Sequence, residues 1–146
     1  MDLILWRHAE AEEGRADLER QLTSKGRKQA AHVAEWLLQR LPAKFSVIAS
    51  PAARAQQTAE ALGVKFKTEK AIAPGASVSR LLGAADWPDH KGTVIVVGHQ
   101  PDLGNAISFL VSGSQEAWRL KKGALWWLSN NKDELLVRAA MSPDLL

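Results

Sequence analysis

Residues 3–12, LILWRHAEAE, change abruptly from an apolar run to charged side chains. The run that ends at Trp6 is rich in branched residues, which is typical of a strand buried on both faces of a sheet. Arg7 and His8 follow at once and would therefore stand at the carboxyl end of that strand. Such residues often end a strand merely to reach solvent. Whether these two have a function therefore depends on which side chains the rest of the sequence places near them.

Three short apolar runs predict strands, namely residues 2–6, 46–50 and 93–98. A pattern of helical spacing follows each run. We expect these three helices to run from a cap at Thr23 or Ser24 to Leu41 before Pro42, over 52–62 before Gly63, and over 101–111 with Pro101 in the first position. Near the end, residues 124–129 and 134–140 flank the turn sequence NNKD, which predicts a hairpin.

Strands that alternate with helices predict an α/β fold with a mainly parallel central sheet and helices on both faces. The terminal hairpin would add antiparallel strands. No linker, low-complexity tract or internal repeat interrupts the sequence. We therefore expect residues 1–146 to form a single domain.

Composition excludes several classes of protein. No apolar stretch is long enough to cross a bilayer and no signal-peptide pattern is present, so we expect a cytoplasmic protein without a membrane partner. The chain has no cysteine, which excludes disulfides, thiolate nucleophiles and cysteine zinc sites. Its net charge of +3 comes from scattered basic residues, so we expect no nucleic-acid partner.

Basic side chains and imidazoles follow the predicted parallel strands. Ligands of open parallel sheets bind beyond the carboxyl ends of the strands. Arg7 and His8 follow the first strand, Arg54 lies four residues after Ser50, and His99 follows the third strand. The sequence thus delivers two arginines and two histidines to the same edge of the sheet.

Arg54 is also unusual for its place in a helix. It falls in the predicted first turn, where the helix dipole favours carboxylates and a cation costs a few tenths of a kcal/mol, roughly. A bound anion would remove that cost. A tolerated surface arginine is the alternative, and we favour a phosphate shared by Arg54 and the helix amides.

Four segments in this chain resemble the histidine phosphatase superfamily. Residues 3–12 are similar to its Arg-His-Gly signature, whose histidine becomes phosphorylated, and residues 49–62 to its Ser-Pro-x-x-Arg-Ala-x-Gln-Thr segment. Residues 20–30 resemble its Leu-Thr-x-x-Gly-x-x-Gln-Ala helix start, and residues 94–103 its second-histidine segment. The small chain, without a large inserted cap subdomain, looks like the SixA branch, the phosphohistidine phosphatases.

The resemblance implies a phosphoglycerate mutase-like fold and a role for each matched residue. His8 would be the nucleophile, and Arg7 and Arg54 would bind the phosphoryl oxygens. His99 would supply a fourth contact, and Arg20 a further one. Guanidinium groups suit phosphoryl oxygens because their donors form a fork. No metal or other cofactor is implied.

Two departures from the family pattern bear on function. Ala9 replaces the signature glycine, and we expect a negative φ that alanine tolerates. Other branches place a carboxylic acid after position 71 as general acid, but residues 71–85 contain none and the next carboxylate is Asp86. Glu10 is the alternative acid, if it faces the site.

These features predict a phosphatase with a covalent phosphohistidine intermediate. Its expected substrate is phosphohistidine on a protein, such as a phosphotransfer domain, because an imidazole leaves without help from a protein acid. Two alternatives stay open, a small-molecule phosphomonoesterase of the same superfamily and a catalytically silent phosphate-binding module.

Overall fold

The computed structural model describes residues 1–146, and a single six-stranded sheet lies at its centre, in the order β3-β2-β4-β1-β5-β6. The strands are β1 (Asp2–Arg7), β2 (Ser46–Ala49), β3 (Lys67–Thr68), β4 (Thr93–Gly98), β5 (Leu125–Asn131) and β6 (Glu134–Met141). The pairs among β3, β2, β4 and β1 are parallel, whereas β5 pairs antiparallel with both β1 and β6. This arrangement confirms the predicted mainly parallel sheet with an antiparallel hairpin.

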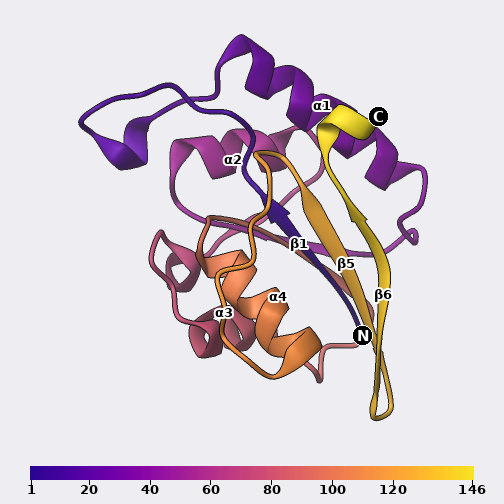
Figure 1. The fold of residues 1–146 in the computed structure, drawn as a ribbon. Helices are drawn as coiled ribbons and strands as arrows, with labels where there is room; N and C mark the ends of the chain where they lie inside the picture. The colour runs from indigo at the N-terminus through magenta and orange to yellow at the C-terminus, as the bar shows by residue number, and fades with distance from the viewer.

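Helices cover both faces of the sheet, as predicted (Figure 1). The α-helices are α1 (Ser24–Leu38), α2 (Ala53–Glu60), α3 (Val78–Ala84) and α4 (Asp102–Ser112). Leu3 and Leu5 of β1 pack into the core on the side of α3 and α4, and Ile4 and Trp6 into the core on the side of α1 and α2. Alternate side chains of one strand thus build two cores, because successive residues point to opposite faces.

The main differences from the sequence prediction lie in short elements and helix ends. Helix α1 ends at Leu38, before the predicted Leu41, although Leu41 packs on the same core and its amide still donates to the carbonyl oxygen of Leu37. Pro101 precedes α4 as its N-cap and is not its first residue. The sequence prediction missed α3, β3 and three 3-10 turns, η1 (Asp17–Glu19), η2 (Lys70–Ile72) and η3 (Pro143–Leu145), since so few residues carry no periodic signal.

The terminal hairpin is tighter than NNKD suggests. Strand β5 continues through Asn131, so only Lys132 and Asp133 form the turn. Lys132 has a φ of 60°, which a two-residue hairpin turn requires. None of the helices combines the length and apolarity needed to span a membrane.

Candidate active site

A polar pocket of about 280 Å³ lies where β1, β2 and β4 end. These strands end nearly level, because Arg7 is aligned with Gly98 and Ala49 with Val97. The pocket is lined by all five of the side chains that the sequence prediction selected, which are Arg7, His8, Arg20, Arg54 and His99. Residues far apart in sequence therefore meet at one edge of the sheet, as predicted.

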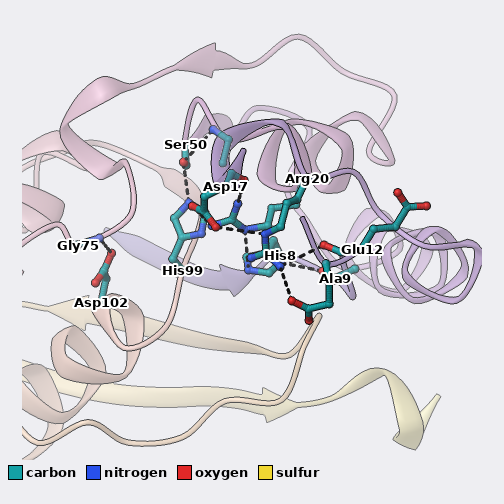
Figure 2. Close-up of polar contacts among 12 residues, drawn as sticks. His8, Ala9, Glu12, Asp17, Arg20, Ser50, Gly75, His99 and Asp102 are labelled. Carbon is teal, nitrogen blue, oxygen red and sulfur yellow. Dashed lines mark hydrogen bonds and ion pairs between the residues drawn. The ribbon is translucent and has the colours of Figure 1, made fainter. Parts of the chain in front are cut away.

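His8 is buried and held in one orientation. Its Nδ1 lies 2.7 Å from the carbonyl oxygen of Ala9, so Nδ1 carries the proton and donates it there (Figure 2). The lone pair is then on Nε2, the nitrogen that faces Arg54. Ala9 has a negative φ, so alanine fits this position without strain, as expected.

The pocket keeps both histidines neutral. Burial is the largest cause that lowers the pKa of His8 from 6.5 to about 4, and the charges of Arg54 and Arg7 lower it further. Burial, together with His8 and Arg54, lowers the pKa of His99 to about 3. An unprotonated imidazole is the nucleophilic form, so His8 is in that form at neutral pH.

Arg54 is tied to a residue that the sequence prediction missed. Its Nε donates to Nε2 of His8 at 3.3 Å, and its Nη1 donates to the carbonyl oxygen of Asp17 at 2.7 Å. The Asp17 carboxylate lies 3.2 Å from Nη2. The arginine at the start of α2 therefore has a carboxylate partner within the chain. No sequence signal pointed to Asp17, because η1 is only three residues long.

His99 has a partner on one ring nitrogen and none on the other. Its Nε2 lies 2.7 Å from Oγ of Ser50, and that oxygen also accepts from the amide of Ala52 at 3.2 Å (Figure 2). With the Ser50 hydroxyl as the hydrogen-bond donor to Nε2, the ring proton of His99 is on Nδ1. That Nδ1 is buried without a hydrogen-bond partner in the protein, as is Nε of Arg7. Both are donors suited to an anionic ligand.

No carboxylate near the pocket is placed beside His8 as a buried acid would be. Glu10 accepts a hydrogen bond from Oγ1 of Thr23 at 2.8 Å and lies in a neighbouring cleft, not in the His8 pocket. Glu13 lines the pocket, but its side chain is 98% exposed. Arg20 lines it as well, while it donates to Asp17 and to the carbonyl oxygen of Glu12.

Asp102 supports one wall of the pocket, and the sequence prediction did not select it. Its carboxylate accepts from the amides of Gly75 at 2.9 Å and Ala76 at 3.1 Å (Figure 2). These bonds hold the loop that carries Pro74, which lines the pocket. Burial raises the pKa of Asp102, although the two amide bonds oppose that shift. The only sequence signal for this contact was that the residue between Pro101 and Leu103 is acidic.

This arrangement suits phosphoryl transfer. A transferring phosphoryl group spreads negative charge over its oxygens, and fixed cationic donors stabilise that charge. The pocket offers three guanidinium groups and two neutral imidazoles, those of His8 and His99. No three His, Asp or Glu side chains gather closely enough anywhere in the chain to hold a metal ion.

Comparisons with known proteins agree with this geometry. The family model described as Histidine phosphatase superfamily (branch 1) matches residues 3–76. An uncharacterized protein of Picosynechococcus is 38% identical over 130 residues, which cover 77% of this chain and 76% of that protein.

Solved structures share the whole fold. A proposed phosphohistidine phosphatase SixA from Nakamurella multipartitia is 27% identical, with a TM-score of 0.80 over 97% of this chain and 95% of that one. A proposed alpha-ribazole-5'-P phosphatase from Escherichia coli is 20% identical, with a TM-score of 0.75 over 98% of each chain, and shows the fold alone. Because the family model matches half of its length and the Picosynechococcus protein is 38% identical to it, the chain belongs to the histidine phosphatase superfamily (branch 1).

Proposed function

We propose that this protein is a phosphohistidine phosphatase, which removes the phosphoryl group from a histidine of another protein. Nε2 of His8 attacks the phosphorus while the bond from phosphorus to the substrate imidazole breaks. The electron pair of that bond goes to the imidazole, which takes a proton from solvent. A water molecule then attacks phosphohistidine 8, the bond to Nε2 breaks, and inorganic phosphate leaves.

The observation that carries the proposal is the orientation of His8. The bond from Nδ1 to Ala9 leaves the lone pair on Nε2, and Nε2 faces the guanidinium of Arg54. In the bound state, Arg54, Arg7 and Nδ1 of His99 would donate to the phosphoryl oxygens. Arg20 lines the same pocket and would add a further contact.

The choice of substrate rests on the leaving group. An alkoxide leaves slowly without a proton donor, and no buried carboxylic acid lines the pocket, since Glu13 is exposed and Glu10 lies outside it. Imidazolium has a pKa of about 6.5, so solvent can protonate a departing imidazole. A pocket without an acid therefore favours phosphohistidine over alkyl phosphates.

The test compares kcat/KM for a phosphohistidine-bearing protein with kcat/KM for simple alkyl phosphates. We expect the phosphohistidine protein to be the better substrate. Brief exposure to labelled substrate should leave acid-labile, alkali-stable phosphate on the protein, and His8→Ala should abolish both the label and turnover. Equal or faster cleavage of alkyl phosphates would instead favour a small-molecule phosphomonoesterase, the activity for which the Escherichia coli chain is named. Absence of turnover on both substrates would favour a silent phosphate-binding module.

We also propose that the reaction needs no metal ion, since the guanidinium groups supply the positive charge at the phosphoryl group. Activity should survive exhaustive chelation without change in kcat. Loss of activity with a chelator and its recovery on adding a divalent ion would contradict this proposal.

A further inference from the structure

A second, larger cleft of about 860 Å³ adjoins the active-site pocket. Arg7 and Lys122 line both, so the two hollows adjoin at these side chains. The cleft lies between α1, the chain just before β5, and η3. Any molecule that places a phosphoryl group on His8 and extends past Arg7 enters this cleft.

The cleft concentrates the positive charge of the molecule. Six lysine and arginine side chains line it, namely Arg7, Lys25, Lys28, Arg119, Lys121 and Lys122. Only two carboxylates oppose them, Glu10 beside Lys122 and Asp144 beside Lys121. The cleft thus carries four net positive charges, whereas the whole chain carries three. The rest of the molecule is therefore slightly negative.

Several of these cations lack any partner in the protein. Lys25, Lys28 and Arg119 form no ion pair. The first turn of α1 contains Lys25 and no acidic residue, although the helix dipole favours the opposite charge there. The charge of Arg119 also lowers the pKa of Arg7, after the larger effect of burial. An anion in the cleft would relieve this repulsion.

We propose that this basic cleft binds an aspartate- and glutamate-rich segment of the substrate protein, next to its phosphohistidine. This proposal rests on the function proposed above. A protein that presents a histidine to His8 reaches the cleft with its neighbouring surface where that surface lies over Arg7 and Lys122, which line both hollows. Acidic side chains there would match the charge of the cleft, speed encounter and exclude basic partners.

The lining of the cleft disfavours other occupants. Leu120 and Pro143 are its only apolar side chains, so an apolar helix would bury little surface there. No tryptophan or phenylalanine lines it and His32 is its only aromatic ring, so the bases of a nucleic acid would find little stacking surface. Exposed lysines give a hydrated, adaptable surface that suits carboxylates of a protein segment.

The test uses two synthetic peptides that contain one phosphohistidine, flanked either by glutamates or by glutamines. The cleft variant is Lys25→Glu/Lys28→Glu, which leaves the His8 pocket intact and suits the helix dipole, so it should fold. The matched control, Lys44→Glu/Lys65→Glu, makes the same charge change at exposed lysines outside the cleft.

We expect kcat/KM of the cleft variant on the glutamate peptide to fall by about tenfold or more, because KM rises. The kcat/KM of the variant should also depend less on salt concentration than that of wild type. On the glutamine peptide and on a small phosphoramidate, the change should stay within about twofold, as it should for the control variant on every substrate. Equal losses on both peptides, or no loss on either, would overturn the proposal.

Binding of the unphosphorylated glutamate peptide, followed by fluorescence anisotropy, tests the cleft without turnover. Wild type should bind it more tightly than the cleft variant does. If the peptide binds in this way but no phosphohistidine is cleaved, the proposed function fails and the docking surface stands. Equal binding by wild type and variant, or tighter binding of single-stranded RNA than of the peptide, would refute the docking surface.

Discussion

At the scale of single residues, Arg54 connects His8 with the loop that follows β1. Its Nε donates to His8, and its two terminal nitrogens contact Asp17. A guanidinium can make these contacts together because its donors are spread over a rigid plane. The carboxylate of Asp17 also offsets the unfavourable position of a cation at the start of α2.

Arg54→Lys is therefore expected to lower kcat/KM by more than about tenfold, since lysine keeps the charge but loses bonds worth on the order of 1.5–3 kcal/mol each. Steady-state kinetics on a phosphohistidine substrate would measure the loss. Arg80→Lys, an exposed position on α3, serves as the control and should change nothing. Normal kinetics for Arg54→Lys would show that the forked geometry is unimportant.

At the scale of elements, the start of α1 packs directly against the chain that follows His8. Gly26 is buried, and a Cβ at this position would overlap the carbonyl oxygen of Glu10. The same carbonyl accepts the amide of Thr23, the N-cap of α1. A glycine is thus required because the helix and the loop approach too closely for any side chain.

Gly26→Ala is expected to destabilise the protein by about 1–3 kcal/mol, because the overlap outweighs the gain in helix propensity. The matched control is Gly83→Ala in α3, where an added Cβ meets nothing within 4 Å. That control should stabilise the protein by roughly 0.5–1 kcal/mol. Urea unfolding of both variants measures the difference, and a stabilised Gly26→Ala would contradict the packing described here.

At the scale of the whole molecule, the two helical layers and the sheet bury a pair of neutral histidines. The folded state lowers the pKa of His8 to about 4 and that of His99 to about 3, from an ordinary value of 6.5. Below pH 6.5, these two histidines therefore bind protons in the unfolded chain that they do not bind in the folded chain. The free energy of unfolding is at its full value above pH 6.5 and falls as the pH drops toward the folded values.

The predicted slope is about 1.4 kcal/mol per pH unit for each histidine across the middle of this window. Urea unfolding at a series of pH values between 7.5 and 4.5, roughly the window set by the two pKa values, would measure it. His99→Gln should flatten the slope, because the folded state lowers the pKa of His99 to about 3. A flat stability profile for the wild-type protein would rule out two buried neutral histidines.

The sequence by itself determined the alternation of strands and helices and the edge at which the pocket lies. Short apolar runs marked β1, β2 and β4, and the rule that parallel strands end together placed Arg7, His8, Arg54 and His99 at one edge. These signals are local, since each needs only a few neighbouring residues. The roles of the four side chains stay predictions until the variants are measured.

Only the tertiary structure decided how those side chains are held. Asp17 contacts Arg54 across 37 positions of sequence, Ser50 contacts His99 across 49, and Asp102 contacts Gly75 across 27. Such contacts leave no periodic trace in the sequence, because each depends on where two distant segments come to lie. The same holds for Glu10, which contacts Thr23 and Lys122 and lines the basic cleft instead of the pocket of His8, two positions before it in sequence.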